Sequence, residues 1–434
     1  MLHIFSLKRH FILLGICIFL LGAGALVPLA SFAKPVTSRH SLSGSFRFGY
    51  YRSVCSAGFG SAHCHAFVYT NAQGVPLVQP KASGPLASSY GPAQFHVGYN
   101  LPCSVGGTSE QALCSQPSSF GGQTIGIVDA YNDPTIQNDL NTYDKQYGLP
   151  SCTTTNGCFK IVNQNGSPSH LPATNAGWAL EISLDVETAH EICQNCKILL
   201  VEASSSSFTS IGTAENTAAR LGATEISNSY GGSEFLGETS YDSYYNHPGV
   251  AVTVSSGDGG YGVEYPAASP NVVAVGGTTL NLNSNNTYNN ESAWSGGGSG
   301  CSAYETANSW QTSLADWSQT GCGSERGVAD VSADADPNTG AAVYDSTPYE
   351  RESGWFQVGG TSLSSPLIAG VFALAGGVSS TTPAQQVPYL NSSNLHDVTS
   401  GSNGICGTIM CTAGPGPGYN GPAGNGTPDG TGGF

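Results

Sequence analysis

Short apolar runs alternate with helical patterns from about residue 90 onward. The runs are nearly continuous in Val, Ile, Leu and Ala instead of alternating with polar residues, as in strands that are buried on both faces. They cover residues 124–128, 197–201, 223–227, 250–254 and 271–275. Helical patterns lie between them, at 134–147 and 211–221. This order predicts an α/β fold, with a mostly parallel sheet covered by helices on both faces.

The chain divides into three parts along its length. Residues 1–33 contain Lys8 and Arg9, then an apolar run, then small residues that end at Ala33, which predicts a secretory signal peptide. A membrane anchor is the alternative. Residues 34–88 are polar and irregular, and we expect a short N-terminal arm or pro-peptide. Residues 89–434 form the predicted single catalytic domain, in which the Gly/Asn/Ser-rich stretch 281–300 predicts a long surface loop.

Composition narrows the class of protein. The 434 residues include 13 Lys and Arg against 29 Asp and Glu, for a formal net charge of -16. This balance excludes a basic patch for nucleic acid. Only 10% of the residues are charged, which excludes a coiled coil. We expect a secreted, extracellular monomer that works in acid and has no stable membrane association after signal removal.

Cysteine spacing also predicts an exported protein. Of 13 Cys residues, Cys17 lies in the signal segment, and the other 12 fall into near-neighbour pairs. We expect these pairs to form local disulfides in an oxidising compartment. The pairs are Cys55/Cys64, Cys103/Cys114, Cys152/Cys158, Cys193/Cys196, Cys301/Cys322 and Cys406/Cys411. Zinc bound by Cys193 and Cys196 is the alternative for one pair.

Gly360-Thr361-Ser362 precedes an apolar helical run and is the sharpest chemical signal in the chain. A serine there lies at a helix N-terminus, where local N–H groups and the helix dipole favour a developing anion. The same residues also suit an ordinary helix cap, because Pro366 follows in the first turns.

Two acids accompany this serine on another predicted helix. Glu181 and Asp185 are four residues apart, so their Cβ atoms lie about 5–6 Å from each other on one helix face. Apolar neighbours in the same turns indicate burial, and two buried carboxyl groups that share a proton have one raised pKa. A solvated acidic stripe is the alternative.

Asp258 is the third element, in a glycine turn directly after a buried strand. Ligands of open parallel sheets bind at the carboxyl ends of strands. A protonated Asp258 would donate a hydrogen bond to an oxyanion. The alternative is an aspartate that bonds to its own turn.

Together these motifs resemble the sedolisin family of serine–carboxyl peptidases, which have a subtilisin-like fold. The resemblance covers about residues 90–434 and includes 126–131, 227–232 and 274–278. It implies a doubly wound subtilisin-like domain. It further implies the site residues Ser362 as nucleophile, Glu181 as general base, Asp185 as its partner and Asp258 as oxyanion donor.

The resemblance implies two more sets of residues. Gly231 and Gly232 would let a substrate strand pair with the sheet edge. A calcium site would use Asp397, Val398, Gly416, Gly418 and Asn420, the last in place of the family's aspartate. Asn420 lacks a charge, so calcium binding would be weakened, and a turn without metal is the alternative. We expect no organic cofactor.

The leading prediction is a secreted serine endopeptidase that hydrolyses proteins or peptides at acidic pH through an acyl-enzyme. One alternative is a conventional hydrolase that uses Ser362, His190 and Asp129. Another is an inactive protein that keeps the scaffold for binding. The family typically carries a long pro-segment that it removes by self-activation, whereas only residues 34–88 separate Ala33 from the predicted catalytic domain here.

Overall fold

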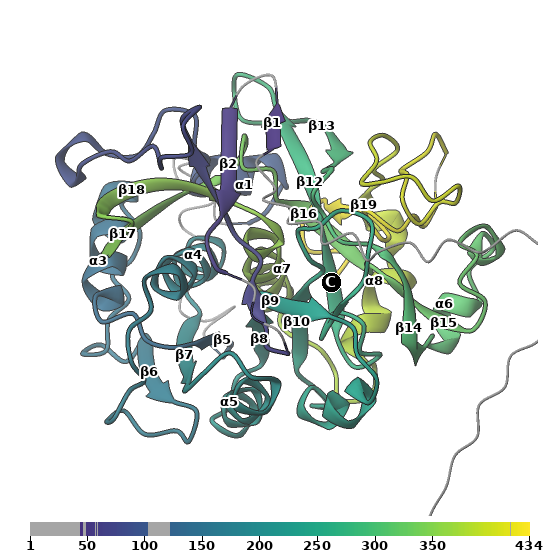
Figure 1. Ribbon diagram of the computed structural model, residues 1–434, viewed down its shortest axis with the longest axis horizontal. Helices are drawn as coiled ribbons and strands as arrows, with labels where there is room; N and C mark the ends of the chain where they lie inside the picture. Colours follow the sequence, from purple (N-terminus) through teal and green to yellow (C-terminus); the bar gives the residue numbers. More distant parts are fainter. Residues whose placement is uncertain (1–43, 47–48, 57, 59, 103–121, 417) are drawn as a thin grey trace, which may run out of the picture. The chain divides into compact units, whose positions relative to one another are not determined.

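A mostly parallel eight-stranded sheet forms the centre of the computed structural model (Figure 1). The structure describes residues 44–46, 49–56, 58, 60–102, 122–416 and 418–434. Strand order is β13-β12-β10-β8-β5-β7-β6 with β16 beside β12, and only β13 is antiparallel to its neighbour. The strands are β5 (Thr124–Ala130), β6 (Phe159–Asn163), β7 (Lys197–Ala203), β8 (Glu225–Asn228), β10 (Ala251–Ser255), β12 (Val273–Leu282), β13 (Tyr288–Ala293) and β16 (Val331–Asp334).

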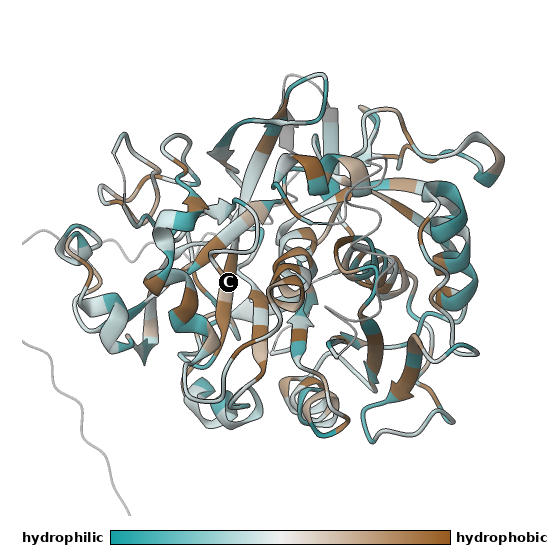
Figure 2. Ribbon diagram, turned by 180° about the vertical axis from the view of Figure 1, so that it is seen from behind, coloured by the Kyte–Doolittle hydropathy of each residue, from teal (hydrophilic) through white to brown (hydrophobic). Residues whose placement is uncertain are grey.

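Helices cover both faces of this sheet, which confirms the predicted α/β architecture. Helices α4 and α7 pack against each other on one side, and α5 packs against β5 and β7 on the other (Figure 1). Figure 2 shows apolar colour on α7 and polar colour on the outer helix α3, so α7 is a core helix. The helices are α1 (Pro92–Gly98), α3 (Ile136–Tyr147), α4 (Ala176–Ile192), α5 (Phe208–Arg220), α6 (Ser309–Thr312), α7 (Thr361–Ala375) and α8 (Val387–Leu390).

A second, antiparallel sheet takes three strands from the segment that is predicted to be irregular. Its order is β1-β2-β4-β18-β17. The strands are β1 (Gly44–Phe46), β2 (Gly49–Ser53), β4 (Phe67–Thr70), β17 (Ala341–Tyr349) and β18 (Glu352–Gly359). The prediction that this segment is irregular is therefore wrong for its described residues, whereas its role as an arm or pro-peptide stays a prediction. Strand β4 pairs with β2 and with β18, which is almost 300 residues away in the chain, and no local pattern reveals such a partner.

The prediction of a long surface loop at 281–300 is also wrong. Strand β12 extends to Leu282 and pairs with β13, so most of this stretch is a hairpin. Asparagines on the exposed edge strand hide the pattern. Smaller sheets contain β3 (His63–Cys64), β9 (Tyr230–Ser233) and β11 (Glu264–Tyr265); β14 (Gly300–Thr306) and β15 (Glu325–Val328); and β19 (Leu395–His396) and β20 (Thr427–Pro428).

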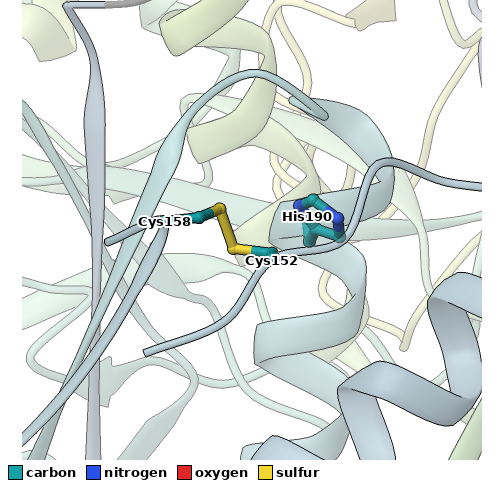
Figure 3. A group of neighbouring side chains, drawn as sticks. All are labelled: Cys152, Cys158 and His190. Atoms are coloured by element: carbon teal, nitrogen blue, oxygen red, sulfur yellow. A yellow bond between two sulfur atoms is a disulfide. The ribbon is translucent and has the colours of Figure 1, made fainter. Parts of the chain in front are cut away.

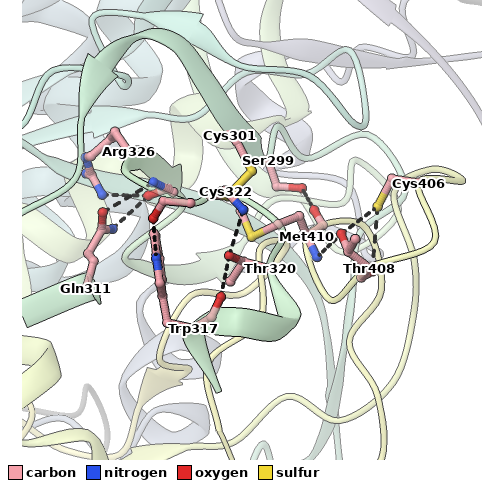
Figure 4. Close-up of a disulfide and its surroundings, with 12 residues drawn as sticks. Ser299, Cys301, Gln311, Trp317, Thr320, Cys322, Arg326, Cys406, Thr408 and Met410 are labelled. Carbon is pink, nitrogen blue, oxygen red and sulfur yellow. Dashed lines mark hydrogen bonds between the residues drawn. A yellow bond between two sulfur atoms is a disulfide. The ribbon is translucent and has the colours of Figure 1, made fainter. Parts of the chain in front are cut away.

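Five of the six predicted disulfides form within the described residues, and Figure 4 shows Cys301–Cys322 beside Trp317 and Thr320. The alternative of zinc at Cys193 and Cys196 is wrong, because these two sulfurs bond to each other. The predicted pair Cys103/Cys114 and the signal segment with Cys17 lie outside the described residues. Among the helices that are described, none has the length and apolar character needed to cross a membrane.

Candidate active site

The turn between β18 and α7 holds Ser362 at the start of a buried helix. Gly360 has φ +102°, in the left-handed region that favours glycine, and a Cβ there would overlap the carbonyl oxygen of His65. Ser362 is the second residue of α7 and is fully buried. Its N–H donates to the His65 carbonyl at 2.9 Å, so this donor already faces a peptide carbonyl.

Ser229, just before β9, fixes Ser362 through two hydrogen bonds. Ser362 Oγ donates to the Ser229 carbonyl at 3.1 Å. Ser229 Oγ donates to the Ser362 carbonyl at 3.3 Å. That carbonyl needs an outside donor because Pro366, four residues later, has no N–H. The nucleophile candidate is thus held by its backbone, and rotation about χ1 redirects its hydroxyl.

Helix α4 brings Glu181 and Asp185 to this serine. The helix is capped by Asn175, whose Oδ1 accepts from the N–H groups of Gly177 at 3.1 Å and Trp178 at 3.3 Å. Both acids are fully buried, and no oxygen of either has a partner of hydrogen-bond geometry among the described residues. Burial raises the pKa of Glu181 and of Asp185 well above the usual range. The structure therefore confirms the prediction that both acids are buried.

Asp129, at the end of β5, adds a third carboxyl group to the pair. Burial raises the pKa of Asp129 to about 8. After burial, the charge of Asp129 is the next largest cause of the raised pKa values of Glu181 and Asp185. The Ser362 hydroxyl lowers the pKa of Glu181, and the Ser229 hydroxyl lowers the pKa of Asp185. Three buried acids and two hydroxyls therefore lie close enough to influence one another's pKa values.

Asp258 approaches Ser362 from the turn after β10. Its Oδ1 accepts hydrogen bonds from the N–H and the Oγ1 hydroxyl of Thr361, both at 2.8 Å. Its Oδ2 has no partner among the described residues. Burial raises the pKa of Asp258 to about 7, against the lowering effect of nearby His65. In acid the free oxygen is therefore able to carry a proton and donate it to a neighbouring oxyanion.

Comparisons with known proteins identify the family to which this chain belongs. Residues 166–426, which are more than half of the chain, match the model of the subtilase family (Peptidase_S8). The chain belongs to the subtilase family. The matched residues include Glu181, Asp185, Asp258 and Ser362, whereas Asp129 precedes them.

This subtilase is also similar to sedolisins, which confirms the resemblance drawn from its motifs. It is 30% identical to sedolisin of Pseudomonas sp. (strain 101) over 323 residues, which are 65% of this chain and 53% of sedolisin. It is 34% identical to kumamolisin of Bacillus sp. (strain MN-32) over 206 residues, 42% of this chain and 35% of kumamolisin. The chain thus spans about half or less of these relatives.

A solved structure supports the same relation. Pseudomonas sedolisin, described as a serine-carboxyl proteinase in complex with two molecules of pseudo-iodotyrostatin, superposes with TM-score 0.61 at 27% identity. The match covers 79% of this subtilase and 96% of that chain. The subtilisin-like fold predicted for the catalytic domain is thereby confirmed.

His190 does not belong to the site, so the Ser/His/Asp alternative is wrong. It is nine residues beyond Glu181 on α4, which is about 13.5 Å along a helix. Its Nε2 lies 2.9 Å from the Pro150 carbonyl and 3.2 Å from Asp144 Oδ1. Figure 3 shows the ring beside the Cys152–Cys158 disulfide. These three side chains are close enough for a metal, but both sulfurs are already bonded.

The two glycines predicted to bind substrate lie on β9, next to Ser229. Gly231 pairs with His63 of β3, and Gly232 pairs with Tyr265 of β11. The position predicted for a substrate strand is therefore taken by the chain's own residues. Nothing in the local sequence of β3 indicates this pairing.

The residues predicted to bind calcium do not fit the ion as they lie. Asn420 Nδ2 donates to the Val398 carbonyl at 3.1 Å, and its Oδ1 accepts from Ala423 N at 3.0 Å. The amide thus directs N–H groups, not oxygen, toward a predicted ligand. Asp397 is exposed, and a Cβ on Gly418 would lie 2.6 Å from a carboxylate oxygen of Asp316. Calcium at these residues stays a prediction that requires the amide to rotate.

Several residues of the site were missed by the sequence analysis. Asp129 was noted only as a partner for His190, although its place at a strand end is the available signal. Thr361, which holds Asp258, was visible as part of the serine motif. Ser229 was quoted in a matching segment without a role, and its contact with Ser362 depends on the approach of two distant segments.

Proposed function

We propose that this subtilase is a serine endopeptidase that cleaves proteins or peptides at acidic pH by a Ser/Glu/Asp mechanism. One observation carries the proposal: Glu181 and Asp185 are fully buried, and the Ser362 hydroxyl at the N-terminus of α7 is near enough to Glu181 to lower its pKa. Among the described residues, no other donor engages the Glu181 carboxyl group. A buried acid without a committed donor is free to exchange a proton with a neighbouring hydroxyl.

The proposed reaction assigns one task to each group. Ser362 Oγ attacks the carbonyl carbon of the substrate while Glu181 takes its proton. Asp185 and Asp129 hold the cluster's remaining protons and keep Glu181 basic enough to accept. The Ser362 N–H and protonated Asp258 donate to the oxyanion. Glu181 then protonates the leaving amine, and water hydrolyses the acyl-enzyme by the reverse proton path.

Acidic pH is proposed because the interior is rich in acids that hold protons. Among the residues that the structure describes, eight aspartates and nine glutamates are buried. Burial raises the pKa of Glu191, Glu215 and Glu225 to about 8, and it has the same effect on Asp129. A fold with this interior avoids buried charge in acid. Secretion is supported by the signal-like N-terminal residues and by the five local disulfides.

The test is hydrolysis of an unfolded, dye-labelled protein between pH 3 and 8 by the full chain, Ser362→Ala and His190→Asn. We expect acidic activity that is lost in Ser362→Ala and kept in His190→Asn, since His190 is remote from the serine. A maximum near neutral pH that disappears in His190→Asn would restore the Ser/His/Asp alternative. Absence of hydrolysis at every pH would support the inactive binding protein.

A further inference from the structure

Residues 62–65 run along β9 as an added strand. His63 and Cys64 pair antiparallel with Gly231 and Tyr230. The N–H of Ala62 donates to the Ser206 carbonyl at 2.9 Å, and the N–H of His65 donates to the Ser229 carbonyl at 3.2 Å. Extended peptides bind an exposed sheet edge by such main-chain bonds. Figure 1 shows this N-terminal segment, in purple, alongside the teal strand β9.

The carbonyl of His65 lies where the reaction needs a scissile carbonyl. It accepts from Ser362 N at 2.9 Å, the donor assigned to the oxyanion. A Cβ on Gly360 would overlap this carbonyl oxygen and would lie 2.5 Å from Asp258 Oδ2. The oxygen therefore lies close to both proposed oxyanion donors.

The chain continues past this carbonyl as a strand on the opposite side of Ser362. Phe67 and Val68 pair with Gly359 and Val358 of β18, the strand that leads into the serine turn. The Ala66 carbonyl accepts from Val54 N at 2.9 Å. The bond between His65 and Ala66 is therefore held by hydrogen-bonded backbone on both sides of the serine.

The side chain of His65 fills a pocket that is built for it. The ring is 1% exposed, with Nδ1 2.7 Å from Ser255 Oγ and Nε2 2.9 Å from Glu264 Oε2. A Cβ on Gly231 would lie 2.6 Å from His65 Cε1, so the glycine makes room for the ring. Glu264 is 19% exposed at its side chain and lines the other side.

Charge in this pocket favours a protonated ring. Burial lowers the pKa of His65. The charge of Glu264 and, more weakly, that of Asp258 raise it by more, so the pKa of His65 lies above its usual value. His65 in turn lowers the pKa of Glu264 despite its burial. The other titratable group is His63, whose ring centroid is 5.2 Å from that of His65. Acid solution therefore gives an imidazolium beside a carboxylate.

We infer that residues 62–67 occupy the substrate groove as a substrate does, with His65–Ala66 as the bond aligned for cleavage and Glu264 as the residue that selects the side chain before it. This inference rests on the proposed function and adds its substrate class, peptides with histidine before the cleaved bond. Ser362 Oγ bonds to the His65 carbonyl carbon and Glu181 takes its proton. The bond to Ala66 nitrogen breaks as that nitrogen is protonated, and water releases the His65 carboxyl group.

The first experiment follows the full chain by intact mass and N-terminal sequencing after a shift from pH 7.5 to pH 4. We expect a new N-terminus at Ala66 that is absent in Ser362→Ala. Glu264→Gln should slow its appearance about tenfold or more. Glu234→Gln is the matched control, because this acid follows β9 but bonds to Ser302 and leaves His65 untouched. Its rate should equal that of the parent.

The second experiment uses octapeptides of residues 61–68 with Ser in place of Cys64 and with His, Leu or Glu at position 65. The acid-treated enzyme should cut the His peptide after position 65 with a kcat/KM at least tenfold above the Leu peptide. Glu264→Gln should bring that ratio close to one. Glu234→Gln, whose carboxyl group bonds to Ser302 instead of His65, should keep the ratio of the parent.

Failure of the inference is distinct from failure of the proposed function. Hydrolysis of unfolded protein without any cut at His65–Ala66, or with equal rates on the three peptides, would overturn the inference and leave the proposed function intact. A lack of hydrolysis of any substrate at every pH would overturn both.

Discussion

The two halves of α4 bury the same kind of side chain in different ways. In the first half, Glu181 and Asp185 have no hydrogen-bond donor among the described residues. In the second half, Glu187 accepts from Tyr344 N at 2.9 Å and Glu191 accepts from the Tyr143 hydroxyl at 2.6 Å. All four are buried, and burial raises the pKa of each.

Burial and a shifted pKa therefore do not separate a catalytic acid from a structural one. Glu191 is fixed by a tyrosine, and its oxygen is committed to that bond. Glu181 has no such bond, and the nearby Ser362 hydroxyl lowers its pKa. The two halves differ because Glu181 keeps uncommitted oxygen lone pairs beside a hydroxyl, whereas Glu191 does not. Proton transfer requires such an acceptor.

The largest expected effect comes from Glu181→Gln. Glutamine is isosteric with a protonated glutamate, so the fold should survive at pH 4 while proton transfer is lost. We expect kcat/KM on unfolded protein to fall by about 10³ to 10⁴. Stopped assays with active-site-independent quantification of folded enzyme measure this.

Glu191→Gln is the matched control for that variant on the same helix. It replaces an acid whose pKa burial raises to about 8, so the acid is already neutral at pH 4. We expect activity within about threefold of the parent and a change of less than ~1 kcal/mol in the free energy of unfolding. Equal activity losses in both variants would contradict the division of α4 into a catalytic and a structural half.

A change of intermediate size is expected from the pH dependence of stability. Acids that are protonated in the fold and ionised in the unfolded chain make the folded state bind more protons. Stability is then fully present below the unfolded pKa of about 4 and declines as the pH rises from there toward the folded values near 8. We expect the melting temperature of Ser362→Ala, which cannot cut itself, to be about 10 °C lower at pH 7.5 than at pH 4. An increase with pH would contradict the raised pKa values.

Asp129→Asn tests whether the first half of α4 acts together with β5. The charge of Asp129 raises the pKa values of Glu181 and Asp185, so its removal should lower them. The limb of the pH profile of kcat/KM that reports ionisation of this cluster should then move to lower pH, with folding retained. An unchanged limb would mean that Asp129 is outside the proton-sharing cluster.

The smallest effect is expected at the predicted calcium residues. Asn420→Asp replaces the amide that donates to Val398 with a carboxylate, which increases the charge available to a cation. We expect millimolar calcium to raise the melting temperature of this variant by a few degrees more than that of the parent. An equal response of both proteins would contradict a calcium site that includes position 420.

The sequence predicted those parts of the molecule whose partners are local. Strands β5, β7 and β10 are mostly apolar runs, and burial on both faces follows from that pattern. Glu181 and Asp185 were recognised because both stand on one helix. Ser362 and Asp258 were recognised because each follows a short glycine motif.

The remaining parts depend on contacts between distant segments. Strand β4 is stabilised by β18, and β3 by β9, with more than 150 residues between the partners in each case. The position of His65 at the serine is set by these pairings and by the Cys55–Cys64 disulfide. A short polar segment carries no periodic signal for such pairing, because its stability is a property of the assembled sheet.

The buried acids change how the molecule should behave in an electric field. The formal charge of -16 counts every one of its 29 acidic side chains as ionised at pH 7. Within the described part of the chain, eight aspartates and nine glutamates are buried, and most of these seventeen acids have raised pKa values. The native chain should therefore migrate toward the anode more slowly than composition suggests, and its measured isoelectric point should lie above the 4.8 calculated from the sequence. Unfolding would release these protons and make the same polypeptide abruptly more anionic.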